Sequence, residues 1–149
     1  MTDLVLTAAA RTAMAEGVNV PAGRALMLAA LLAKADAGVA ASHLEVYGTA
    51  QPGTPGGDPG GPPLAKIYLT RPCGTLTGSV ASLTQASGTG DLIALDGDAE
   101  WARWVGDGVP LADGAVTDEE GDGPFRLLGE TGVALYAGGR VVLGTVALS

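Results

Sequence analysis

The chain has 149 residues, of which 47% are hydrophobic, and a formal net charge of −8. Its single cysteine cannot form an internal disulfide, which argues against a small secreted fold stapled by disulfides. The negative charge is the wrong sign for neutralising phosphates, so we expect no direct contact with nucleic acid.

Neither a signal peptide nor a membrane span is expected. The first apolar run is short and follows Asp3 without preceding basic residues. Arg24 and Lys34 bracket the longest apolar stretch, which is shorter than the roughly 20 residues of a membrane span. These two expectations favour a protein that is made in a cytoplasm and works in solution or in an assembly.

The first 38 residues show helical periodicity. The pattern predicts one helix over 3–16 and a second that starts after Asn19 and ends at Gly38. We expect residues 1–38 either to cover the following domain or to act as an oligomerisation arm. The apolar stripe of the second helix supplies three candidate partner contacts, Leu28, Leu31 and Leu32.

Residues 39–149 predict an antiparallel β-sandwich or barrel of about eight short strands. Residues 48–63 are rich in Pro and Gly, and we expect a flexible surface loop there, with partner contact as one role. The loop lacks the Gly-Lys-Ser/Thr ending of a phosphate-binding loop. The expected strands lie at 43–47, 64–70, 76–83, 91–95, 101–105, 125–128, 133–136 and 141–148. A return strand that begins at Val109 and reaches a second Asp-Gly, Asp113-Gly114, pairs with the strand at 101–105.

The Asp107-Gly108 dipeptide predicts a tight hairpin turn, because these residues accept positive φ angles. Both tryptophans lie on the strand before this turn. Trp101 and Trp104 are three residues apart, so we expect them on opposite faces of the sheet. We assign Trp101 to the core and regard Trp104 as the more exposed of the two, and therefore as a candidate partner contact.

The acidic residues gather between 91 and 130, where eleven acids stand against two arginines. The runs Asp96–Glu100 and Asp118–Asp122 place carboxylates at close spacing, which suits calcium, but neither matches a complete twelve-residue calcium loop. We favour solvated acidic turns, with calcium or a cationic partner as alternatives.

No catalytic constellation is evident. His43 is the only histidine, which argues against a histidine-based metal cluster or catalytic triad. Cys73 follows Pro72 in an expected turn, and we expect a small, buried or half-buried side chain. We therefore assign no catalytic, cofactor-binding or metal-binding residues, expect no cofactor, and do not expect an enzyme.

A series of short strand and turn motifs runs along the chain. Their positions are Leu44, Val46, Tyr47, Gln51, Pro52, Leu64, Ala65, Leu69, Pro72, Ala99, Trp101, Arg103, Asp107, Gly108, Gly138, Gly139 and Val141. In the order of these motifs, the chain resembles a group of small tailed-phage virion proteins. The likeness covers residues 3–148, and two features depart from it: the loop at 48–63 and the acidic turn Asp118–Asp122, where relatives tend toward shorter turns.

The resemblance implies a non-enzymatic structural protein of the virion, made in the host bacterial cytoplasm. Our first expectation is a capsid decoration (cement) protein that binds the major capsid protein and stabilises the head shell. Such a protein is expected to be a homo-oligomer, with a trimer as one form, and to contact no membrane. A tail, neck or baseplate component is the alternative. A carbohydrate-binding β-sandwich that uses an exposed tryptophan is a further alternative.

Overall fold

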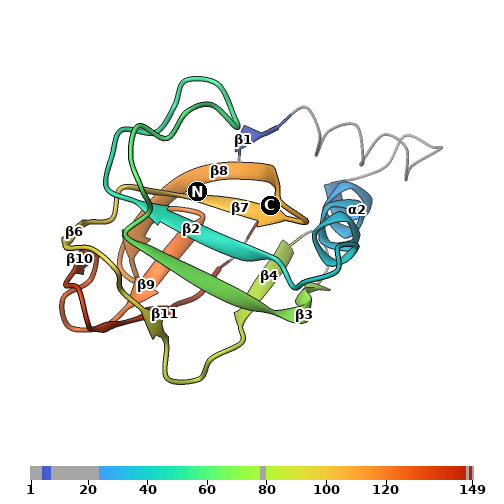
Figure 1. Ribbon diagram of the computed structural model, residues 1–149. Coiled ribbons are helices and arrows are strands. Elements are labelled where there is room, and N and C mark those ends of the chain that lie inside the picture. Colours follow the sequence, from blue (N-terminus) through green and yellow to red (C-terminus); the bar gives the residue numbers. More distant parts are fainter. Residues whose placement is uncertain (1–4, 8–23, 78–79, 147, 149) are drawn as a thin grey trace.

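A curled β-sheet dominates the computed structural model, which describes residues 5–7, 24–77, 80–146 and 148 (Figure 1). Within these residues, the mainly β fold carries one helix. The elements are β1 (Val5–Leu6), α2 (Arg24–Asp36), β2 (His43–Tyr47), β3 (Ala65–Thr77), β4 (Val80–Gln85), β5 (Asp91–Leu92), β6 (Gly97–Asp98), β7 (Trp101–Gly106), β8 (Val109–Asp118), β9 (Phe125–Leu128), β10 (Ala134–Leu135) and β11 (Arg140–Leu143).

The main sheet runs in the order β4-β3-β2-β7-β8-β9-β11-β5 and curls into a half-barrel. Its far end returns toward β3 through a bridge between Ala65 and Ile93, just after β5. A separate pair joins β6 to β10. The prediction of a mainly β protein is confirmed, but the fully antiparallel arrangement is wrong at one place, since β8 and β9 are parallel.

The hairpin predicted at Asp107-Gly108 is confirmed. Both residues have positive φ, 52° and 73°, as a two-residue turn of this kind requires. The strands β7 and β8 leave the turn paired as Gly106 with Val109. The second Asp-Gly, at Asp113 and Gly114, does not end the return strand, because β8 continues to Asp118.

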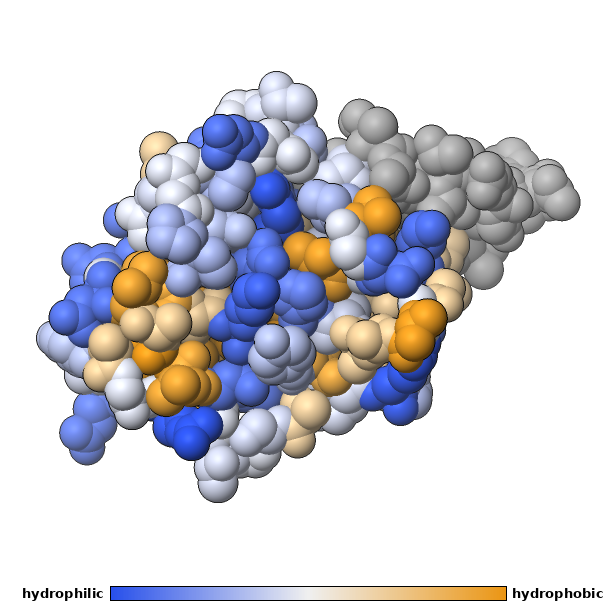
Figure 2. Space-filling model, viewed as in Figure 1, coloured by the Kyte–Doolittle hydropathy of each residue, from blue (hydrophilic) through white to orange (hydrophobic). Residues whose placement is uncertain are grey.

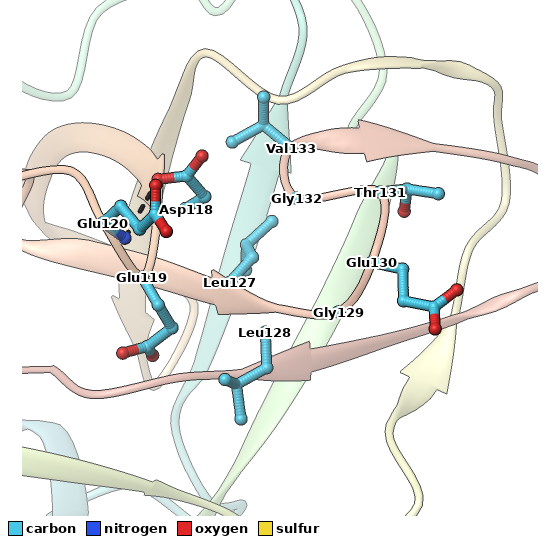
Figure 3. A pocket seen from close by; sticks show the side chains of 10 residues that line it. All are labelled: Asp118, Glu119, Glu120, Leu127, Leu128, Gly129, Glu130, Thr131, Gly132 and Val133. Atoms are coloured by element: carbon cyan, nitrogen blue, oxygen red, sulfur yellow. Dashed lines mark hydrogen bonds between the residues drawn. The ribbon is translucent and has the colours of Figure 1, made fainter.

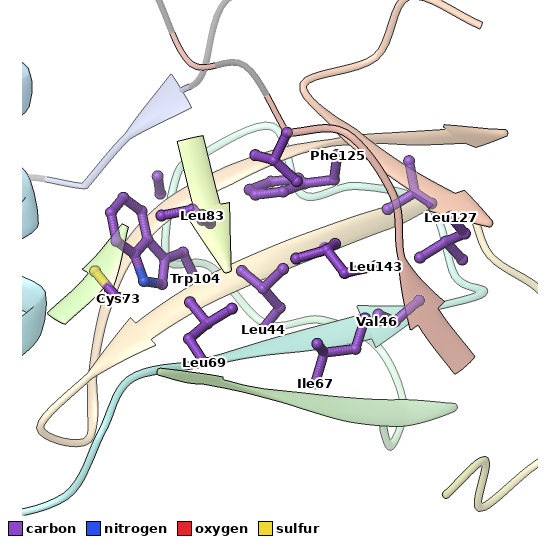
Figure 4. Close-up of a cluster of buried hydrophobic side chains, with 14 of the residues drawn as sticks. Leu44, Val46, Ile67, Leu69, Cys73, Leu83, Trp104, Phe125, Leu127 and Leu143 are labelled. Atoms are coloured by element: carbon purple, nitrogen blue, oxygen red, sulfur yellow. The ribbon is translucent and has the colours of Figure 1, made fainter. Parts of the chain in front are cut away.

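The core lies inside the curl, where alternate residues of neighbouring strands meet (Figure 4). Leu44 and Val46 on β2 point inward beside Ile67 and Leu69 on β3, as the period of two in a strand dictates. Trp104 on β7 joins the same cluster. Because strands from both halves of the sheet contribute, the hydrophobic interior fixes the curl.

The helix α2 packs against β3, β4 and β7. Its buried face consists of Leu28, Leu31 and Ala35, which belong to the same core cluster. Its C-terminal end is fastened by Arg71, whose guanidinium donates to the carbonyl of Asp36 and to two carbonyls just beyond the helix. The predicted second helix is therefore confirmed over 24–36, and it ends two residues before the expected Gly38.

The prediction of a first helix over 3–16 is wrong at Val5 and Leu6. These residues form β1, which pairs antiparallel with β8 at Ala112 and Asp113. That edge of β8 is open there because β9 pairs only further along, from Val116. An unpaired strand edge offers hydrogen-bond partners to the backbone of a neighbouring segment. The first residues of a helix do not gain as many backbone hydrogen bonds. Thr7 is not helical either, and residues 3–4 and 8–16 of the predicted helix lie outside the described residues.

Candidate functional site

A buried ion pair lies on the outer face of the tryptophan hairpin. Arg103 on β7 and Asp113 on β8 face each other across the ladder. The Nε and Nη2 atoms of Arg103 donate to the two carboxylate oxygens of Asp113 at 2.8 and 3.1 Å. The hydrogen bonds and charge of Asp113 raise the pKa of Arg103 against the opposing effect of burial. Arg103 therefore stays charged at any physiological pH.

The Pro/Gly-rich loop at 48–63 covers this pair. Arg103 Nη2 donates to the carbonyl of Gly57 at 2.7 Å, and the amide of Gly56 donates to Asp113 at 3.1 Å. Figure 1 shows the loop rising beside β1 and β8. The predicted lack of regular structure is confirmed, but the loop does not stand free of the domain, because the ion pair ties it to the sheet.

Trp101 completes this cluster on the outer face. Its ring stacks on Tyr47, with 4.6 Å between ring centroids and 15° between planes. The guanidinium carbon of Arg103 lies 5.1 Å from the Trp101 centroid, within the range of a cation–π contact. The indole nitrogen donates to Thr49 Oγ1 at the start of the loop. We call Tyr47, Trp101, Arg103 and Asp113 the loop clasp.

The two tryptophans face opposite sides of the sheet, as predicted, but Trp104 is not the more exposed of the two. Both have a relative exposure of 0%. Trp104 lies in the barrel core, where its indole nitrogen donates to Ser42 Oγ at 3.2 Å. Spacing alone indicated opposite faces. The spacing did not indicate that the loop at 48–63 covers the outer face and buries Trp101 as well.

The three candidate partner contacts on α2 also lie against the core. Leu28 and Leu31 are buried in the core, and Leu32 is half-buried against it. In this fold the surface that a partner would touch does not include Leu28, Leu31 or Trp104, so we do not propose them as contacts.

The half-buried side chains of His43 and Glu45 and the buried side chain of Tyr47 form a polar row on β2. Glu45 is hydrogen-bonded to His43 Nε2 at 3.1 Å and accepts the Tyr47 hydroxyl at 2.8 Å. Burial raises the pKa of Glu45, but the hydrogen bonds from His43 and Tyr47 outweigh it, and the net pKa is lowered. Burial and Glu45 together raise the pKa of Tyr47. The row thus holds a carboxylate beside a neutral phenol.

Cys73 is buried, as predicted. Burial and the nearby carboxylate of Asp36 raise the pKa of its thiol to about 12. Its backbone amide donates to that carboxylate at 3.0 Å, which ties β3 to the end of α2. The thiol is protonated at neutral pH, so it lacks the thiolate that nucleophilic chemistry requires.

The acidic turn after β8 borders a hollow of about 460 Å³ between the loops 118–120 and 127–133 (Figure 3). Asp118 accepts the amides of Glu120 and Gly121 through one carboxylate oxygen. Glu119 accepts the amide of Thr145 at 2.6 Å. These carboxylates hold the backbone of the turn. Among the described residues, no group of three or more His, Cys, Asp or Glu side chains is arranged to hold a metal ion.

A second hollow, of about 410 Å³, lies where the far end of the sheet returns to β3, and we call it the seam groove. Tyr68 and Leu92 line it and are 50% and 56% exposed, and Lys66 and Arg140 add two cations. Figure 2 shows apolar surface beside polar surface on this face. No pattern in the sequence predicts this groove, because its residues come from three separate segments.

Comparison with protein-family models, with curated proteins and with solved structures found no match to this chain. The described part of the chain contains no helix long and apolar enough to cross a membrane.

Proposed function

We propose that the protein is a non-enzymatic structural component of a tailed-phage virion, and specifically a capsid decoration protein that binds the major capsid protein and stabilises the head shell. The observation that carries this proposal is the loop clasp. Trp101 and Arg103, two of the residues on which the resemblance to phage virion proteins rests, hold a sixteen-residue surface loop onto the sheet.

Several other motif positions also serve the framework. Leu44, Val46 and Leu69 fill the core, and Asp107 with Gly108 makes the hairpin turn. A virion component must hold its shape through assembly and outside the cell, so a motif made of framework residues suits that role better than a motif made of reactive side chains. This supports the structural reading.

Among the described residues, the ion pair and the thiol, whose side chains could serve catalysis, are engaged in packing. Arg103 and Asp113 neutralise each other, and the thiol of Cys73 is buried and protonated. The carbohydrate-binding alternative relies on an exposed tryptophan. Neither tryptophan presents one, so that alternative has less support than the structural role.

Removal and re-addition of the protein test the proposal. Phage particles made without this gene are expected to lose DNA at a lower temperature than complete particles, and the purified chain added back should restore the higher temperature. A buffer-only addition is the control. Unchanged shell stability, with particles that lack tails or fail to attach to cells, would refute the decoration role and favour a tail, neck or baseplate component.

A further inference from the structure

Two surfaces of opposite chemistry lie at different places on this protein. The seam groove carries the cations Lys66 and Arg140, and the acidic turn at 118–122 carries four carboxylates. We propose that copies of this chain bind one another by seating the acidic turn of one copy in the seam groove of the next. The proposal rests on the proposed function, because it names the contact of the homo-oligomer expected of a decoration protein, and it is tested on the purified chain alone.

The groove offers both apolar area and positive charge. Tyr68 and Leu92 expose half of their surface beside the groove, although large apolar side chains gain free energy when they are buried. The Nζ atom of Lys66 lies 3.9 Å from Glu45 Oε2, at the outer limit for an ion pair, and the Lys66 side chain stays 46% exposed while that of Glu45 is 19% exposed. No ion pair involves Arg140 among the described residues.

The single acid that lines the groove is already engaged. Asp91 accepts the backbone amide of Tyr68 at 3.2 Å and the side-chain amide of Gln85 at 2.7 Å through the same oxygen. Those two bonds hold the carboxylate of Asp91 against Tyr68 and Gln85. Lys66 and Arg140 are therefore the groups left to attract an incoming anion.

The acidic turn presents the complementary surface. Asp118, Glu120 and Asp122 are exposed, and none of them forms an ion pair in the described part of the chain. Leu128, 50% exposed, lies at the edge of the same hollow and supplies an apolar contact. Opposite charges around exposed apolar side chains are the composition expected of a specific, partly polar interface.

The net charge of the chain makes this pairing selective. Copies that each carry −8 repel one another in most orientations, and only an orientation that places an acidic surface against exposed cations relieves the repulsion. The two hollows share no lining residue, so one copy can use both surfaces at once. Either a two-fold dimer or a closed ring satisfies this arrangement.

Charge reversal provides the test, by sedimentation equilibrium of the full chain. One variant reverses the groove (Lys66→Glu with Arg140→Glu), and the other reverses the turn (Glu120→Lys with Asp122→Lys). Each variant alone should associate at least about tenfold more weakly than the wild type, because like charges then face each other. A one-to-one mixture should regain association, since each reversed surface meets its opposite on the other variant. Lys34→Glu, on α2, is the matched control and should associate as the wild type does.

Three results would overturn the proposal. These are a wild-type chain that remains monomeric at its highest soluble concentration, a groove variant that associates normally, and a mixture that stays dissociated. Circular dichroism and thermal unfolding check that each variant folds, and Leu92→Ser serves as a second groove variant if the double reversal does not. Because shell stability is measured separately on particles, failure here leaves the decoration role to its own test.

Discussion

Removing the carboxylate of Asp113 should destabilise the protein strongly. In Asp113→Ala, Arg103 stays buried but loses both hydrogen bonds to its partner, and Gly56 loses its acceptor. Breaking one side of a buried ion pair costs about 3–5 kcal/mol. For a chain of this length that corresponds to a fall in melting temperature of roughly 6–20 °C. Urea and thermal unfolding followed by circular dichroism measure the change.

Two further variants separate the ion pair from a general effect of mutation. Asp122→Ala removes an exposed carboxylate and should change stability by no more than about 0.5 kcal/mol. The double variant Arg103→Met with Asp113→Leu should lose less than the two single variants together, because no charge is left buried alone. In every variant that lacks the pair, amide hydrogen exchange in the loop at 48–63 should accelerate. A loss below about 1 kcal/mol in Asp113→Ala, or unchanged exchange in the loop, would refute the loop clasp.

Three other predictions follow from burial and titration. Acrylamide should quench Trp101 and Trp104 far less in the native protein than in the unfolded chain, and Trp104→Ala should cost about 3–5 kcal/mol; strong native quenching would contradict the buried placement. Cys73 should resist a thiol reagent at pH 8 until urea unfolds the chain, and rapid native labelling would show that the thiol is accessible. Because the fold lowers the pKa of Glu45, its contribution is present above about pH 4.5 and is lost as the pH falls through the lower folded value. Glu45→Gln should therefore destabilise the protein at pH 7 but much less at pH 3, and an equal loss at both values would contradict the assignment.

Local signals predicted the local structure well. The Asp107-Gly108 turn, the strand at 43–47 and the helix over 24–36 follow from residue types and periodicity, because turn chemistry and amphipathic spacing act over a few residues. The opposite facing of Trp101 and Trp104 follows from the same period of two.

Contacts distant in the sequence escaped prediction. The parallel pairing of β8 with β9 and the addition of β1 to β8 depend on which strand edges the curl leaves open. The burial of Trp101 under the loop depends on Arg103 and Asp113, whose pairing required the register of the hairpin. An arginine two residues after a tryptophan, opposite an aspartate across a known turn, was a usable signal for that pair.

The seam groove likewise could not be predicted from the sequence, because it depends on contacts between distant residues. Lys66, Leu92 and Arg140 lie on three strands that are far apart in the sequence, and the return of the sheet brings them together. Composition located the acidic partner of the groove, since eleven acids cluster between 91 and 130, but composition gave no indication of where the cations would gather.

The number of copies per particle tests the decoration role most directly. Purified virions, analysed by quantitative mass spectrometry against the major capsid protein, should contain hundreds of copies of this chain, in a fixed ratio to the shell subunits. A few tens of copies or fewer would contradict a decoration protein, because a shell-stabilising layer must occupy repeated positions over the whole head.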